Sequence, residues 1–265
     1  MIREPAVSGM FYPSDREKLN EMVDYFIENA LSKVEEKKYR GIIVPHAGYI
    51  FSGRTQGFSY TAEIPERAII FGVNHHAQGA PVSLFGEGKW RVPNGILDCD
   101  SEIYKVLMKE SDVFALDPHA HLEEHSIEVQ LPFLIRRNPQ VLITPISIYD
   151  YRVEIIREIG RAISKILFKF PNTILIASSD FSHYVPDEVA RKKDHIAIAK
   201  ILESDAEGLW EVVEGNNITM CGLGPVGALL FSLGKAKASE LFYETSATAS
   251  QDYSNVVGYA SIVFE

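Results

Sequence analysis

Residues 40–49 read RGIIVPHAGY, an uninterrupted apolar run that ends at a proline and a histidine. Two later segments repeat this pattern, residues 67–76 (RAIIFGVNHH) and residues 173–183 (TILIASSDFSH). Strands that are apolar throughout are buried on both faces, as in parallel sheets covered by helices. Segments with helical apolar spacing separate these runs. The sequence therefore predicts an α/β fold in three layers, a largely parallel central sheet with helices on both faces.

Helices are expected where apolar residues recur every three to four positions. Ser14 and Glu17 form a capping box that opens the first helix, whose apolar face extends to Val34. Pro132 is expected to kink the helix at 122–137. The other helices are predicted at 52–63, 101–110, 152–169, 187–204 and 225–234, and the strands at 40–44, 67–73, 141–148, 173–178, 240–245 and 256–264, with a β-rich stretch from Pro81 to Leu97. No linker, repeat or low-complexity run interrupts this order, which predicts a single domain over residues 1–265.

Composition argues against several classes of protein. The 265 residues are 46% hydrophobic and 23% charged, proportions typical of a soluble globular protein. The net charge of −10 argues against binding to nucleic acid or to anionic lipid. The N-terminus is too polar for a signal peptide, and the longest apolar runs are too short to span a bilayer. Together with the use of only two cysteines, these features predict a cytoplasmic protein.

Three of the predicted strands end in segments that carry histidine. His46, His75 and His183 each follow an apolar run. His46 and His75 are 29 residues apart, about the length of one βαβ unit, so we expect their strands to be adjacent and parallel. Ligands bind beyond the carboxyl ends of such strands. A single histidine there is usually a hydrogen-bonded loop residue, but three at equivalent positions favour a shared site.

Cys221 offers a ligand of another kind. It precedes an apolar helix that is expected to begin near Pro225, and a helix N-terminus favours the thiolate. By itself Cys221 could equally be a small buried residue. Combined with His46 and His75, it predicts a metal site of two histidines and one thiolate, which suits Fe, Cu or Zn rather than Mg or Ca. Cys99 has no comparable context and is expected to be structural.

Asp180 and His183 lie three residues apart in the segment after the third strand. Asp180 could orient a ligand imidazole, bind the metal itself, or cap the following turn. His183 could act as a general base. Tyr49 and His76, which follow the first two strand ends, are interpreted as pocket-lining residues, although an aromatic residue such as Tyr49 is more often a packing residue.

The sequence HLEEH at 121–125 matches the H-x-x-E-H pattern of inverted zinc peptidases. On a helix, His121 and His125 would lie one turn apart and bind zinc, with Glu124 as the base. Five-residue patterns with two histidines also arise by chance, which makes the peptidase the weakest interpretation. His125 would share a helical face with Glu128, and there it either lines the pocket, pairs with Asp180, or is simply a satisfied helix residue.

Several motifs occur in the order seen in the Memo family, which the chain resembles from Arg3 to the last strand at 256–264. They are REPAVSGMFYP (3–13), PHAGY (45–49), NHH (74–76), EHSIE (124–128), SSDFSH (178–183) and Cys221-Gly222. The resemblance implies a fold similar to the catalytic subunit of LigB-type extradiol dioxygenases, which are non-haem iron enzymes.

The same resemblance implies roles for individual residues. His46 and His75 match the metal-binding histidines, and Cys221 stands where the third ligand falls. His183 is similar to the dioxygenase general base, with Asp180 beside it. Prokaryotic relatives are named for a gene system, AmmeMemoRadiSam, whose AMMECR-type and radical-SAM proteins would be the partners.

The third ligand departs from the dioxygenase pattern. Extradiol enzymes complete their iron site with a carboxylate, whereas this chain has Cys221 at that position. A thiolate donates more charge to iron, so dioxygenase activity does not follow from the fold. We expect a metal-dependent redox enzyme, with iron first and copper or zinc as alternatives. The alternative is a non-catalytic metal- or peptide-binding module that acts through protein partners.

Overall fold

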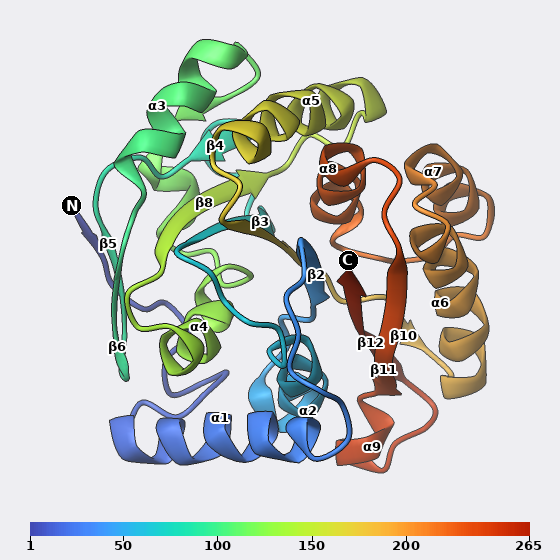
Figure 1. The fold of residues 1–265 in the computed structure, drawn as a ribbon. Helices are drawn as coiled ribbons and strands as arrows, with labels where there is room; N and C mark the ends of the chain where they lie inside the picture. Colours follow the sequence, from blue (N-terminus) through green and yellow to red (C-terminus); the bar gives the residue numbers. More distant parts are fainter.

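The computed structural model describes all 265 residues, which are arranged around a nine-stranded sheet (Figure 1). Its strands follow the order β10-β12-β2-β9-β3-β8-β4-β7, and β11 pairs with β12 outside this path. A small second sheet has the order β1-β5-β6. The strands are β1 (Ile2–Arg3), β2 (Gly41–Val44), β3 (Arg67–Val73), β4 (Val82–Leu84), β5 (Lys89–Val92), β6 (Gly95–Asp98), β7 (Ala115–Leu116), β8 (Leu142–Ile148), β9 (Thr173–Ser178), β10 (His183–Val185), β11 (Ala238–Thr245) and β12 (Val256–Phe264).

The centre of the main sheet is parallel, and its flanks are antiparallel. β2, β9, β3 and β8 run in the same direction, whereas β12 and β4 flank them in the opposite direction. The prediction that β2 and β3 are neighbours is wrong, because β9 pairs with both and lies between them. The length of the connection between β2 and β3 limits how far apart the two strands can lie, but it does not prevent a strand from later in the chain, here β9, from pairing between them. All three strands still end at the same edge of the sheet.

Helices cover both faces of this sheet (Figure 1). Successive side chains of a strand point to opposite faces, and because the central strands are apolar throughout, both faces must be buried. Ile43 and Phe71 belong to one core and Ile42 and Ile70 to the other. The first core is covered by α3 (Ser101–Glu110), α5 (Val153–Lys169), α6 (Asp187–Leu202), α7 (Ala206–Gly215) and α8 (Leu223–Leu233), and the second by α1 (Arg16–Leu31), α2 (Tyr49–Ser59) and α4 (Leu131–Arg137). The three-layer prediction is confirmed, while α7 and the short α9 (Ala247–Ser250) were not predicted.

The first helix begins one residue later than the capping box predicts. Asp15, not Ser14, is the N-cap of α1, and its side chain accepts the backbone N–H of Lys18 at 2.9 Å. Aspartate caps a helix as well as serine does, so two candidate caps in succession leave the start ambiguous. The helix ends at Leu31, before the predicted apolar face does.

Residues 122–137 differ most from the prediction. Only α4 is an α-helix, and it follows 3-10 turns at Pro118–His121 and Glu128–Gln130. Pro132 lies in the first turn of α4, where its missing N–H leaves no bond unmade, so it kinks no helix. Residues 122–127 are irregular because the Glu124 carboxylate accepts the backbone N–H groups of the two residues that follow it.

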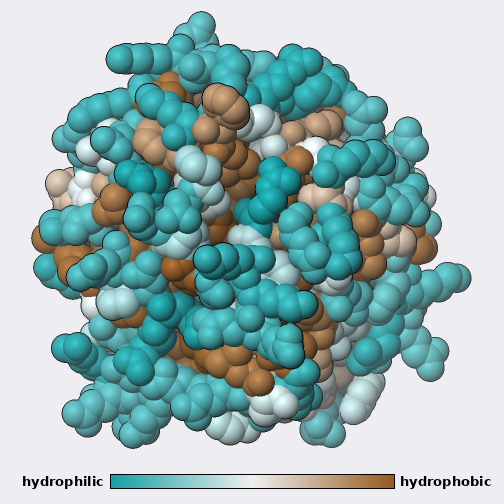
Figure 2. Space-filling model, in the orientation of Figure 1, coloured by the Kyte–Doolittle hydropathy of each residue, from teal (hydrophilic) through white to brown (hydrophobic).

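The visible surface is mostly hydrophilic (Figure 2). Figure 2 shows one face of the molecule on which hydrophilic side chains dominate, with hydrophobic atoms gathered near the centre and low in the view, near α1 and α2. None of the helices combines the length and the apolar character needed to cross a bilayer.

Candidate metal centre

Three potential metal ligands meet at the carboxyl edge of the parallel strands. His46 lies two residues after β2, His75 two residues after β3, and Cys221 two residues before α8. Their donor atoms all lie within 4.8 Å of one another, and Cys221 Sγ is 3.2 Å from His46 Nε2. The structure thus brings together the two imidazoles and the thiol that the sequence grouped. We refer to these three residues as the three-donor cluster.

Glu124 orients the ring of His75. Its carboxylate accepts the backbone N–H of His75 at 2.7 Å and the ring Nδ1–H at 3.0 Å. A carboxylate can only accept, so Nδ1 carries the proton and Nε2 keeps its lone pair. Burial by itself raises the pKa of Glu124, but the hydrogen bond and the charge of His75 bring it well below its ordinary value. Such carboxylate–histidine pairs are typical of metal sites.

Ser178, the last residue of β9, does the same for His46. Its Oγ lies 2.9 Å from His46 Nδ1, 2.8 Å from the carbonyl oxygen of Ser126 and 3.1 Å from Gln130 Nε2. The hydroxyl has one proton, and the Ser126 carbonyl can only accept it, so His46 Nδ1 donates to Ser178. His46 therefore presents an unprotonated Nε2 to Cys221.

The donor set fits a transition-metal ion. Burial, followed by the neighbouring His125 and His75, lowers the pKa of His46 well below its ordinary value, so the ring is neutral as a ligand must be. Burial raises the pKa of the Cys221 thiol well above its ordinary value, so a binding metal must displace the thiol proton. Imidazole nitrogens and sulfur within this distance of one another suit Fe, Cu or Zn, and not Mg or Ca.

Asp180 supports the cluster through the backbone. Its buried Oδ1 accepts the backbone N–H of His46 at 2.8 Å, and its own N–H donates to Cys221 Sγ at 3.3 Å. The sequence predicted that Asp180 orients an imidazole, binds metal or caps a turn. The structure instead places it between the two loops that carry His46 and Cys221. Burial raises the pKa of Asp180 to about 6, against the lowering effect of the His46 N–H and of the charge on His183.

His183 lies near the cluster, close enough to His46 to lower the pKa of that residue. Its ring Nδ1 is 2.8 Å from the Thr219 carbonyl oxygen, and its backbone N–H donates to Thr219 Oγ1 at 2.7 Å. Because the carbonyl can only accept, Nδ1 carries the proton and Nε2 is left with its lone pair. The next residue, Tyr184, has a left-handed φ of 58° and is 76% exposed, an unusual conformation for a bulky side chain.

A second group of donors, formed by His75, Glu124 and His125, also lies within 4.8 Å. His125 stacks on His75 with ring centroids 4.7 Å apart, but its Nδ1 is 3.6 Å from Glu124 Oε1. Glu124 already accepts from His75 and from the N–H groups of His125 and Ser126. Its oxygens are therefore used within the protein, which favours an orienting role over a second metal site. The predicted pairing of His125 with Asp180 is absent, since Asp180 binds the loop of His46.

Two residues predicted to line the pocket have other neighbours. His76 is exposed, and its ring Nε2 lies 3.1 Å from the carbonyl oxygen of Glu123. Tyr49 is buried, and its hydroxyl donates to the carbonyl oxygen of Val129 at 2.6 Å while its ring packs on Phe133. His76 thus lies at the surface, and Tyr49 is a packing residue in the second core.

His121 does not join His125 in a zinc site. Its ring is fully buried beside Phe85 and Trp90, and its Nε2 lies 3.1 Å from Ser83 Oγ. Neither group of potential metal ligands includes it. Because the residues between His121 and His125 are not helical, the two rings do not share a helix face, and the zinc-peptidase interpretation is wrong.

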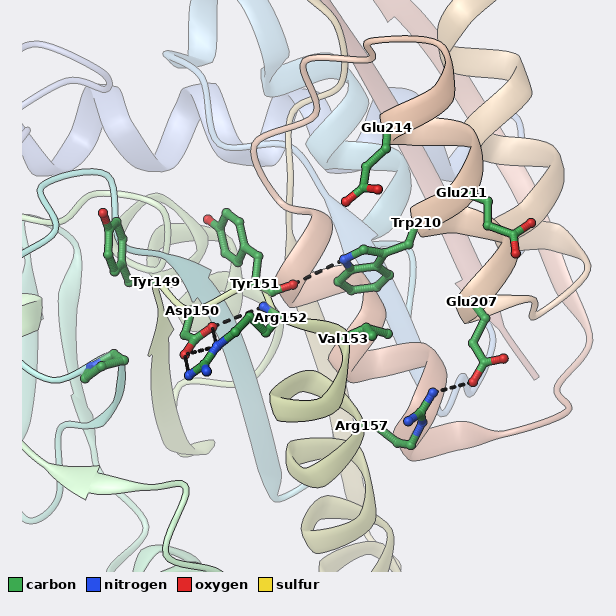
Figure 3. Close-up of a pocket in the computed structure, with 11 residues that line it drawn as sticks. Tyr149, Asp150, Tyr151, Arg152, Val153, Arg157, Glu207, Trp210, Glu211 and Glu214 are labelled. Atoms are coloured by element: carbon green, nitrogen blue, oxygen red, sulfur yellow. Dashed lines mark hydrogen bonds and ion pairs between the residues drawn. The ribbon is translucent and has the colours of Figure 1, made fainter.

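A large hollow has a lining that includes none of the three cluster residues, and Figure 3 shows the residues that line it. It has a volume of about 930 Å³ and is lined by α7 and by the connection from β8 to α5. Tyr151 separates the two sites, because its hydroxyl donates to the Cys221 carbonyl at 3.1 Å while its own carbonyl accepts Trp210 Nε1–H at 3.2 Å. The charged pairs drawn at the hollow are Arg152–Asp150 and Arg157–Glu207.

Four residues that support the site were not predicted in these roles. They are Glu124, which was considered only as a peptidase base, Ser178, Thr219 and Tyr151. Each forms a hydrogen bond to a residue distant in the sequence, so local spacing does not reveal the contact. The available signals were the family motifs that contain Glu124 and Ser178, and the position of Ser178 at the end of an apolar run.

Comparison with known proteins finds relatives that align with this chain over nearly the whole length of both sequences. A family model described as "Memo-like protein" matches residues 3–263. A MEMO1 family protein of Methanocaldococcus jannaschii is 42% identical over 289 residues, covering 100% of this chain and 99% of that protein. Similar proteins of Aquifex aeolicus and Pyrobaculum arsenaticum are 39% and 38% identical, each over 99% of both chains.

One solved structure, of an uncharacterized protein from Escherichia coli K12, is similar with a TM-score of 0.58. It is 13% identical and covers 86% of this chain and 100% of that chain. At this identity the likeness concerns the fold alone. The architecture is consistent with the LigB-like fold that the family resemblance implied.

Proposed function

Because the chain belongs to the Memo family, we propose that the three-donor cluster is a non-haem metal centre of an oxidoreductase related to the extradiol dioxygenases. The observation that carries the proposal is the convergence of His46, His75 and Cys221, whose donors come from three separate parts of the chain. Iron is the proposed ion, and copper or zinc are the alternatives that the same donors accept.

Residues around the cluster orient its histidine rings so that an unprotonated nitrogen of each can bind a cation. Glu124 and Ser178 hold the Nδ1 protons of His75 and His46, so both rings keep Nε2 for a ligand. Asp180 ties the loop of His46 to the backbone next to the thiol. When bound, iron or copper would supply one-electron redox chemistry and open coordination positions, whereas zinc, which is not redox-active, would supply only the open positions.

His183 is the proposed general base. Its Nδ1–H is held by Thr219, so Nε2 can accept a proton from a bound substrate. His125 lines the same space, with its ring against His75 and Phe11. The burial that keeps His125 neutral lowers its pKa to about 4, so it adds no positive charge to the centre near neutral pH.

Elemental analysis of protein purified without added metal tests the centre. We expect one metal ion per chain in the wild type, and loss of that ion in Cys221→Ser. Cys99→Ser is the matched control, because it also removes one sulfur but from a buried side chain outside both donor groups. Equal metal content in the two variants would overturn the proposal.

Oxygen uptake by metal-loaded protein, with small diols and thiols as substrates, tests catalysis. His183→Gln is expected to keep the metal and lose turnover. His76→Gln, at an exposed histidine, should keep both. A metal-loaded wild type that turns over none of these substrates would instead favour a binding module that acts through protein partners.

A further inference from the structure

Arg3 is the one arginine or lysine of the chain that is fully buried. Its guanidinium lies over the ring of Trp90, 4.7 Å from the centroid, and pairs with the equally buried Glu128. Because taking two charges out of water is costly, a buried pair adds little net stability by itself. The other hydrogen bonds of Arg3 indicate a further role.

Arg3 binds the backbone of the segment that orients His75. Its Nη2 donates to the carbonyl oxygen of Glu124 at 2.6 Å, and its Nε donates to the carbonyl oxygen of His121 at 3.1 Å. The side chain of the same Glu124 accepts both N–H groups of His75. A single residue, Glu124, thus connects Arg3 to a member of the three-donor cluster.

The N-terminal segment, residues 3–12, also meets the loop of His46. The carbonyl oxygen of Phe11 accepts the backbone N–H of Tyr49 at 2.8 Å, and the Phe11 ring lies 4.8 Å from that of His125. The carboxylate of Glu128 holds the middle of the segment; its donors there are Ala6 N, Val7 N and the Tyr12 hydroxyl. The segment therefore contacts the start of the helix that follows His46 and the 121–128 segment that orients His75, and it contributes no ligand of its own.

We propose that Arg3 is a positioning residue of the metal centre and that order in residues 3–12 is coupled to metal binding. The inference rests on the proposed function, because it requires the cluster to bind a metal. Coupling between two sites is reciprocal. If the N-terminal segment holds His75 and His46 in place, a metal bound to them must in turn hold the segment.

Amide hydrogen exchange of the wild-type protein with and without Zn²⁺ tests this coupling without a variant. We expect Zn²⁺ to slow exchange in residues 3–12 and 121–128 and to leave α3, which contacts neither ligand loop, unchanged. Protection of the ligand loops with no change in residues 3–12 would overturn the inference alone. Failure of the wild type to bind Zn²⁺ would overturn the proposed function and the inference with it.

Arg3→Lys tests the positioning role directly. Lysine keeps the positive charge beside Glu128 but lacks the planar guanidinium that reaches two carbonyl oxygens. We expect the affinity of the folded protein for Zn²⁺ to fall about tenfold. Arg136→Lys is the matched control, because Arg136 pairs with Asp24 at 2.7 Å at the surface and outside residues 3–12, and its affinity should match that of the wild type. Equal affinities in the two variants would contradict the role assigned to Arg3, and hydrogen exchange of the wild type decides the question if Arg3→Lys fails to fold.

Discussion

Replacing Glu124 by glutamine should weaken metal binding although it removes no ligand. Oε2 accepts the backbone N–H of His75 at 2.7 Å, and Oε1 accepts those of His125 and Ser126 at 2.9 and 2.8 Å. The ring Nδ1 of His75 lies 3.0 and 3.1 Å from the two oxygens. A glutamine has one oxygen, so its NH₂ group must face at least one of these donors.

Fewer hydrogen bonds are lost if the NH₂ group takes the position of Oε2, where it faces only the backbone N–H of His75, than if it takes the position of Oε1, which accepts two backbone N–H groups. A partly buried donor left without a partner costs about 1–3 kcal/mol. A bound cation makes the His75 ring more acidic, and its bond to a carboxylate then strengthens more than a bond to a neutral amide does. Only this second effect differs between the metal-free and the metal-bound protein, and loss of such a carboxylate partner lowers metal affinity about 10- to 100-fold.

Competition between the protein and a chromophoric chelator for Zn²⁺ or Co²⁺ measures this change. Glu123→Gln is the control, because the neighbouring Glu123 side chain makes only one long contact, 3.5 Å to Gln78. We expect the control to match the wild type. A Glu124→Gln protein that is folded and binds metal as tightly as Glu123→Gln would refute the assigned role of the carboxylate.

Burial lowers the pKa of His121 to about 3, so the folded protein keeps this ring neutral while the unfolded chain takes up a proton near pH 6.5. The stability that this neutral ring contributes is complete above pH 6.5, and about 2 kcal/mol of it is lost by pH 5. Urea unfolding measures how far the free energy of unfolding falls between pH 7 and pH 5. This fall should be about 2 kcal/mol smaller in His121→Phe than in the wild type, and unchanged in the exposed His119→Phe. Gly222→Ala would place a Cβ 2.2 Å from the Cβ of Ser179, so calorimetry and elemental analysis should show a lower melting temperature and a lower metal content together. Tyr184→Gly removes the cost of a left-handed tyrosine, which exceeds the entropy cost of glycine, and should raise the free energy of unfolding by up to about 1 kcal/mol. A value below that of the wild type would show that φ = 58° is unstrained.

The candidate cluster could be predicted because its members lie directly beside regular elements. A buried strand such as β2 shows as an apolar run, and His46 follows it after one residue. The carboxyl ends of parallel strands share an edge whatever the strand order is. The error about the neighbours of β2 therefore left the convergence of His46 and His75 intact.

The supporting residues could not be predicted in the same way. Ser178 and Glu124 act on rings 132 and 49 residues away in the sequence, and only the folded chain joins them. The segment around Glu124 carries apolar residues at helical spacing, yet its carboxylate takes the backbone N–H groups that a helix would use. Arg3 lies near the chain end, where a buried arginine is not expected.

The missed helix α7 had a signal that could have been used. Asp205 stands at its N-cap and accepts the backbone N–H of Gly208 at 2.9 Å. Leu209 and Val213 lie one turn apart on its buried face. The helix is only ten residues long and begins soon after α6 ends, and the predicted helix at 187–204 stopped before it.

X-ray absorption at the metal edge of the zinc-loaded wild type tests the metal centre most directly, because it identifies the ligand atoms. We predict one sulfur at about 2.3 Å and nitrogen ligands at about 2.0–2.1 Å, with the sulfur lost in Cys221→Ser. A spectrum of the wild type with only nitrogen and oxygen neighbours would contradict the assignment of Cys221 as a ligand.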